Sequence, residues 1–138
     1  MKWIGKAIIV VILLCSLVMP AQAAIRGKGG KRIKVAAEPI LDNILKGFEF
    51  DDYYTYARDF HPSLKVLGSK TKFFKISRYI QRSLGRCLEK EYLGSLTRGD
   101  VIVVLWKGVF DKTKNDVLIK VELSKKSRRY LVTGLWLQ

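Results

Sequence analysis

Residues 101–110 read VIVVLWKGVF, a dense run of β-branched and aromatic side chains that is typical of a buried strand. Apolar and polar residues alternate over 117–123 and again over 131–137, which predicts two further strands, and a fourth is expected to start at Cys87. Turn-like sequences separate the four runs, at residues 97–100, 111–116 and 124–128. Four strands joined by short turns predict an antiparallel meander.

The part of the chain before these strands has the spacing of helices. Helices are predicted over residues 36–46, 52–59 and 71–84, with a further short turn over 62–67. Pro39 suits the first turn of the first helix, Gly47 its end, and Asp51 the N-cap of the second helix. Because the helices precede the strands, we predict an α+β fold in which N-terminal helices pack on a C-terminal four-stranded antiparallel curved sheet.

Residues 1–23 have the order of an export signal. Two lysines precede an apolar run over residues 8–19, and an Ala-Gln-Ala sequence ending at Ala23 suits cleavage there. The apolar run is shorter than the ~20 residues that span a bilayer, which disfavours a retained anchor helix. A lipid anchor on Cys15 is disfavoured as well, because leucines rather than small residues precede it. We therefore expect an exported protein, periplasmic or secreted.

After cleavage, residues 24–35 are expected to form a flexible basic arm and residues 36–138 a single domain. The mature chain carries 24 basic and 12 acidic side chains, a formal net charge of +12. Its single cysteine, Cys87, excludes an internal disulfide, so an apolar core must stabilise the fold. One thiol and one imidazole are too few for a zinc site, and we predict neither a metal nor a cofactor.

Four short sequences carry a resemblance to a known group: Phe50-Asp51-Asp52-Tyr53, Leu84-Gly85, residues 104–110 and residues 131–136. In the predicted order of elements, they resemble the nuclear-transport-factor-2-like, or cystatin-like, superfamily, and within it small exported bacterial domains of unknown function. The resemblance implies a curved sheet wrapped against helices as a cone, which encloses a pocket in many relatives. It implies no single activity, because the superfamily includes isomerases, dehydratases and many non-catalytic binding proteins.

Four aromatic side chains on the second predicted helix and on two strands are candidates for lining such a pocket: Tyr53, Tyr56, Trp106 and Trp136. Pockets with such linings bind small apolar ligands. We therefore expect a non-catalytic binding or accessory domain that holds a small apolar ligand or a protein partner. The resemblance also suggests that two copies pair through the outer face of the sheet, and Leu118 on an otherwise polar strand face fits that expectation.

A second interpretation starts from the positive charge. Four basic residues cluster at the last predicted turn: Lys125, Lys126, Arg128 and Arg129. Together with the basic arm, this cluster would face an anionic envelope surface of lipid or glycan, although solvated charge without a partner is the slightly favoured explanation. Nucleic acid is disfavoured as a partner, because an exported protein seldom meets it.

Two catalytic alternatives have competing structural explanations. The first is an isomerase-like or dehydratase-like site with a carboxylate base and a tyrosine donor, drawn from Asp52, Asp59, Tyr53, Tyr54 and Tyr56. The second is a nucleophilic pair of His61 and Cys87, which needs contact in space and a third, orienting group. Asp52 is better explained as a helix-start residue and Cys87 as a small core residue, so we favour a protein without enzymatic activity.

Overall fold

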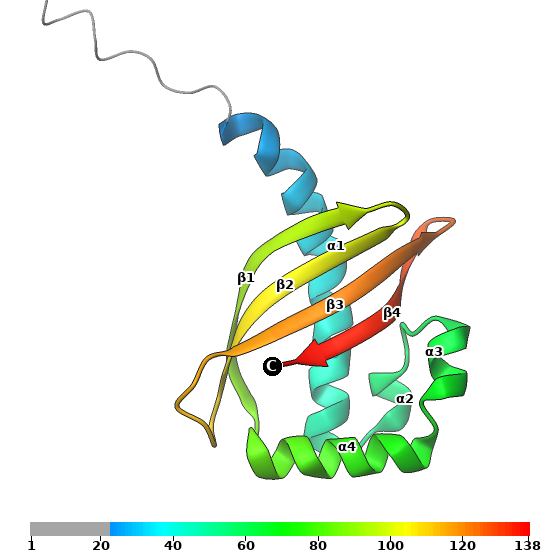
Figure 1. Cartoon of the computed structure of the whole chain (residues 1–138), viewed down its shortest axis with the longest axis vertical. Helices are drawn as coiled ribbons and strands as arrows, with labels where there is room; N and C mark the ends of the chain where they lie inside the picture. The colour runs from blue at the N-terminus through cyan, green and yellow to red at the C-terminus, as the bar shows by residue number, and fades with distance from the viewer. Residues whose placement is uncertain (1–22) are drawn as a thin grey trace, which may run out of the picture.

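The structure is a computed structural model that describes residues 23–138 (Figure 1). Four helices come first in this part of the chain: α1 (Ala23–Phe50), α2 (Tyr53–Tyr56), α3 (Pro62–Leu67) and α4 (Lys70–Ser83). Four strands follow: β1 (Cys87–Arg98), β2 (Val101–Phe110), β3 (Val117–Lys126) and β4 (Arg129–Leu137). They form one antiparallel sheet in the order β1-β2-β3-β4, which confirms the predicted α+β class with the helices N-terminal to a meander. The predicted export signal, residues 1–23, lies outside the described residues except for Ala23.

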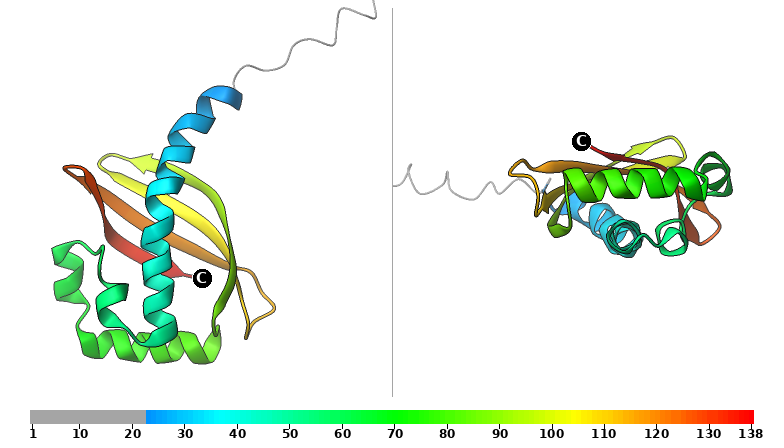
Figure 2. Two further views of the ribbon diagram at one scale, coloured as in Figure 1. Left: turned by 180° about the vertical axis from the view of Figure 1, so that it is seen from behind. Right: turned by 90° about the horizontal axis from the view of Figure 1, so that it is seen from below.

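The apolar core lies between α1 and the inner face of the sheet. The view from behind in Figure 2 shows α1 crossing that face, with the strands running obliquely beneath the helix. On the helix, the Leu41 and Ile44 side chains are almost wholly buried. On the sheet, Trp106 of β2 pairs with Ile119 of β3, and neither side chain has exposed surface. The inward positions of β3 therefore follow the period of two that predicts the strand.

The remaining helices cover one end of the sheet and its β4 edge. Figure 1 shows α4 lying along one end of the molecule, with α2 and α3 beside β4. The link between α2 and α3 pairs with the edge strand at Val132, whose N–H donates to the Asp59 carbonyl (2.8 Å) and whose carbonyl accepts from the His61 N–H (2.8 Å). This pairing uses backbone groups that an open edge would leave free.

The predicted flexible arm, residues 24–35, is instead part of α1, which begins at Ala23. Glycines lower the intrinsic preference of this segment for helix, but tertiary contacts outweigh that cost. Ile33 packs against the core, and the Tyr92 hydroxyl of β1 donates to the Gly30 carbonyl (3.3 Å). Although α1 has 28 residues, no helix of the described residues is long and apolar enough to cross a membrane.

The other corrections concern where the first helices start and end. Pro39 lies inside α1 rather than in its first turn, and α1 continues past Gly47 to Phe50. The helix stops there because the following residue, Asp51, has the left-handed conformation with φ 52°. The Asp52 N–H then donates to the Gly47 carbonyl (2.9 Å). The N-cap of α2 is therefore Asp52 and not Asp51. The turn predicted over residues 62–67 is the helix α3.

Candidate ligand-binding groove

The four aromatic residues predicted to line one pocket lie in three different environments. Trp106 is fully buried, with its indole N–H donating to Glu38 Oε1 (3.1 Å) and its ring edge-to-face with Tyr92 at 6.2 Å. The centre of the sheet is therefore filled by this side chain, and Trp106 does not line a pocket. A fully buried indole satisfied by a carboxylate is a core residue.

Trp136 lies on the outer face of the sheet, away from the helices. It pairs across the ladder with Lys120, whose ammonium lies 3.8 Å from the centroid of the indole ring. The side chain is 37% exposed. Leu118, the residue predicted to mark a pairing surface, shares this outer face, and the pairing of two copies there stays a prediction.

Tyr53 and Tyr56 are the two predicted pocket residues that the structure brings together. They line an apolar hollow of about 210 Å³ between α2, α3, α4 and β4. Its other lining residues are Phe60, Leu64, Leu67, Gly68, Lys72, Phe73, Ile76 and Leu135. A second hollow, of about 310 Å³, adjoins it and shares Tyr56, Ile76 and Leu135. We call the two hollows together the α2–β4 groove.

Close packing of α2 against α1 and α4 fixes the position of Tyr56 in the groove. A Cβ atom at Gly47 would overlap Tyr56 Cβ and lie 2.7 Å from Tyr56 Cα, so only glycine allows the two helices to approach so closely. The Tyr56 ring packs on Phe60 (4.6 Å between centroids) and on Phe73 (4.7 Å). Burial raises the pKa of Tyr56 to about 12, so its hydroxyl stays protonated and can donate a hydrogen bond at neutral pH.

No acidic side chain of the described residues lines the α2–β4 groove, and the two candidate bases have other partners. Asp52 accepts hydrogen bonds from the Thr55 hydroxyl (2.6 Å) and from two backbone N–H groups of α2, and the Thr55 contacts lower its pKa. A lowered pKa is the opposite of what a general base requires. Asp59 accepts from Asn43 Nδ2 (2.9 Å) and lies 3.9 Å from Arg129. Tyr54 is exposed, and its hydroxyl accepts from Lys70 (2.6 Å).

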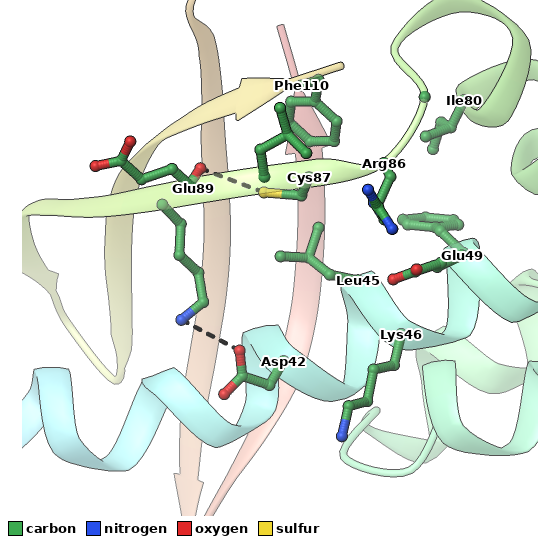
Figure 3. Close-up of a pocket in the computed structure, with 13 residues that line it drawn as sticks. Asp42, Leu45, Lys46, Glu49, Ile80, Arg86, Cys87, Glu89 and Phe110 are labelled. Atoms are coloured by element: carbon green, nitrogen blue, oxygen red, sulfur yellow. Dashed lines mark hydrogen bonds and ion pairs between the residues drawn. The ribbon is translucent and has the colours of Figure 1, made fainter. Parts of the chain in front are cut away.

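Cys87 lies in a separate, charged pocket of about 340 Å³ between α1, the end of α4 and β1 (Figure 3). Asp42 and Lys90 both line this pocket and form an ion pair of 3.1 Å. Burial raises the pKa of the Cys87 thiol, which donates to the Glu89 carbonyl (3.4 Å), so the reactive thiolate is disfavoured. His61 is not among the pocket residues, because it caps α3, where its Nδ1 accepts from the Ser63 N–H (3.2 Å). The structure does not bring His61 and Cys87 together.

The basic cluster of the last turn lies at the exposed hairpin between β3 and β4. Lys125, Lys126 and Arg128 have no ion-pair partner among the described residues, whereas Arg129 lies near Asp59. Within residues 23–138 there is also no group of three His, Cys, Asp or Glu side chains that could hold a metal ion.

Comparison with known proteins adds little to this geometry. No family model matches the chain, and no curated protein matches it. A solution structure of a SEC-C motif containing protein from Rhodopseudomonas palustris is similar to part of the chain, with a TM-score of 0.49 and 14% sequence identity. The similarity covers 75% of this chain and 90% of that one. At this level it supports no statement about function.

Sequence reasoning misses most of the groove residues on α3, α4 and β4. Leu64 and Leu67 lie in a segment predicted only as a turn, which gives no reason to expect them in a lining. Ile76 and Leu135 have the spacing of core residues, yet both line the groove. No local pattern separates a residue that fills a core from one that borders a hollow, because the difference depends on how three helices meet at β4.

Proposed function

We propose that this protein is an exported, non-catalytic binding domain of the cystatin-like superfamily, and that the α2–β4 groove takes a small apolar ligand. The observation that carries the proposal is the groove itself, which has aromatic and aliphatic walls and no acidic side chain among its described lining residues. The order of helices followed by an antiparallel meander agrees with the superfamily resemblance. The export signal in the sequence supports a role outside the cytoplasm.

The size and lining of the groove favour an uncharged or weakly polar ligand. The two adjoining hollows, of about 210 and 310 Å³, compare with the roughly 300–1,000 Å³ of small-molecule sites. Tyr56 lines both, and its protonated hydroxyl supplies a donor for one polar group of the ligand. The walls supply apolar contact, which contributes most of the affinity in such sites.

The proposal is tested with N-phenyl-1-naphthylamine, an uncharged apolar fluorophore whose emission rises on transfer from water to an apolar site. We expect saturable enhancement with the wild-type protein. Ile76→Trp places a larger side chain where the two hollows meet, and we expect it to weaken the affinity at least tenfold. Because Ile76 is 48% exposed, the domain should still fold.

The matched control is Leu118→Trp, which adds a tryptophan of similar exposure to the outer face of the sheet. This variant should bind the fluorophore as the wild type does. Equal binding by wild type and a folded Ile76→Trp variant would place the site elsewhere and remove the basis of the proposal. Absence of saturable binding by the wild type would have the same consequence.

A further inference from the structure

A long stretch of the chain without an acidic residue coincides with one surface of the fold. Residues 60–88 contain seven basic residues and no Asp or Glu, although the whole chain has 12 acidic residues. This stretch includes α3 and α4 and ends at the start of β1. The molecule therefore has a surface where positive charge is not balanced by neighbouring acids along the chain.

The contacts of α4 fix which of its faces is turned outward. Phe73, Ser77 and Ile80 are buried, and the Ser77 hydroxyl donates to the Phe48 carbonyl (3.1 Å) at the end of α1. Gln81 Nε2 donates to the same carbonyl (2.6 Å). These contacts hold α4 on the end of α1, so the opposite face of the helix is exposed.

Basic residues and one large aromatic residue share this outward face. Lys72, Lys75, Tyr79 and Arg82 follow the 3-4-3 spacing that places residues on one side of a helix, and Arg78 lies beside them. We call these five residues the α4 face. None of its four cations has an ion-pair partner among the described residues.

Apolar side chains are exposed within and beside the α4 face. Tyr79 is 70% exposed and Ile76 is 48% exposed, and both also line the second hollow of the α2–β4 groove. Phe74 on α4 and Val66 and Leu67 on the neighbouring α3 are exposed as well. Figures 1 and 2 show α4 as the outermost element along its end of the molecule, with its length parallel to that end. A helix of 14 residues extends roughly 21 Å, so the face offers a long, straight contact surface.

We propose that the α4 face docks the protein on an anionic phospholipid bilayer. Lysine and arginine near an anionic leaflet attract its headgroups, and tyrosine beside aliphatic residues prefers the boundary between headgroups and acyl chains. The exposed hairpin of Lys125, Lys126 and Arg128 has comparable charge, but no large apolar residue is exposed within residues 125–129. On α3 and α4, five such residues are exposed beside the cations: Val66, Leu67, Phe74, Ile76 and Tyr79. The combination of unpaired cations with exposed Tyr79 and Ile76 therefore selects the α4 face as the membrane-binding surface.

The test is sedimentation of the purified protein with vesicles of phosphatidylglycerol and phosphatidylcholine. We expect binding that rises with the phosphatidylglycerol fraction and falls with added salt. Lys75→Glu/Arg78→Glu/Arg82→Glu should lower the partition coefficient about a hundredfold or more, since each cation near the surface contributes roughly fivefold. The control Lys125→Glu/Lys126→Glu/Arg128→Glu changes the net charge equally and should lower it far less.

A second measurement separates a bilayer from other polyanions. Tyr79→Ser should weaken vesicle binding while leaving the elution of the protein from heparin unchanged, because only a bilayer has an apolar layer to receive the ring. In Tyr79→Trp, brominated lipids should quench the fluorescence of the new tryptophan more than that of the wild-type tryptophans.

Three results would overturn the proposal. The wild type does not sediment with anionic vesicles; the hairpin control loses as much binding as the α4 variant; or Tyr79→Ser weakens heparin and vesicle binding equally. The two proposals are measured separately, although Lys72, Ile76 and Tyr79 belong to both surfaces. The α4 charge variant changes no residue that lines the groove, so it should still bind N-phenyl-1-naphthylamine, and sedimentation of the wild type with vesicles is measured without the fluorophore. The two proposals can therefore fail separately.

Discussion

The centre and the β4 edge of the same sheet are covered in different ways. At the centre, α1 lies directly on the inner face, and Trp106, Ile119 and Val121 have no exposed surface. At the edge, the cover consists of the short helices α2 and α3 and one side of α4, and Leu135 borders two hollows. The centre is sealed, whereas the edge retains space for a ligand.

The length of the covering helices explains this difference. α1 packs along the sheet over several turns, and a polar contact of Glu38 with Trp106 and Lys90 joins it to β1 and β2. α2 has four residues and α3 six, so each presents little more than one turn to β4. Short helices meeting at angles leave gaps that a single long helix fills.

The largest expected effect is the removal of the side chain that fills the centre. Trp106→Ala should lower the free energy of unfolding by about 3–5 kcal/mol, because it leaves a large cavity and removes the donor to Glu38. Urea denaturation followed by circular dichroism measures the change. Trp136→Ala on the outer face is the control and should lower the free energy of unfolding by only about 1 kcal/mol, which is the size expected for the cation–π contact of Trp136 with Lys120. Equal losses in the two variants would contradict a sealed centre.

The sequence predicts the sheet well because its signal is local. Alternation over residues 117–123 reflects one buried face, and the structure buries Ile119, Val121 and Leu123 completely. Alternation over residues 131–137 likewise places Trp136 and Leu135 on opposite faces of the sheet. This pattern already indicates that Trp136 does not line the pocket that Leu135 borders. The alternation does not predict the burial of Val132. A register shift after Glu122 changes which residues of β4 face the core, and Val132 is therefore buried.

Helix ends and the groove depend on tertiary contacts that a local pattern does not contain. Gly47 is predicted to end α1, since glycine often follows a helix. In the structure it lies within the helix, and it has to be glycine because a Cβ atom there would overlap Tyr56. The predicted start of this helix, at residue 36, is wrong because the contacts that extend α1 toward Ala23, such as those of Ile33 and Gly30, come from residues far along the chain. Tyr53 and Tyr56 are identified as lining residues from their aromatic type, whereas the gap beside them depends on how three helices meet.

An intermediate effect is expected where the two regions join, at the contact of α1 with α2. Gly47→Ala should destabilise the protein by about 1–3 kcal/mol, because the new methyl group would lie within 2.7 Å of the Tyr56 backbone. Gly29→Ala is the matched control within the same helix, since nothing lies within 4 Å of the position that its methyl group would take, and it should be neutral or stabilising by up to about 1 kcal/mol. Thermal unfolding of both variants distinguishes a close approach from a general effect of glycine in α1. If Gly47→Ala behaved like Gly29→Ala, the edge helices would be more loosely held than the structure indicates.

The smallest expected effect concerns the polar contact that helps to seal the centre. Burial by itself raises the pKa of Glu38, but hydrogen bonds from Lys90 and Trp106 outweigh it and hold the pKa below its usual value of 4.5. Because the folded state prefers the carboxylate, this stabilisation is complete above about pH 4.5 and is lost as the pH falls through the lower, folded-state pKa.

Glu38→Gln should therefore lower the free energy of unfolding by about 1 kcal/mol at pH 7. This is less than the loss expected for a buried hydrogen bond to a charged group, because Glu38 is partly exposed. The difference in stability between the two proteins should narrow as the pH falls below 4.5, since protonated Glu38 and the glutamine that replaces it are both neutral. Urea denaturation at pH 7 and at about pH 3.5 measures this narrowing, and Lys90→Gln, which removes the main cationic partner, should reduce it. A difference that stays constant with pH would show that Glu38 acts by packing alone, and the seal over Trp106 would then be apolar throughout.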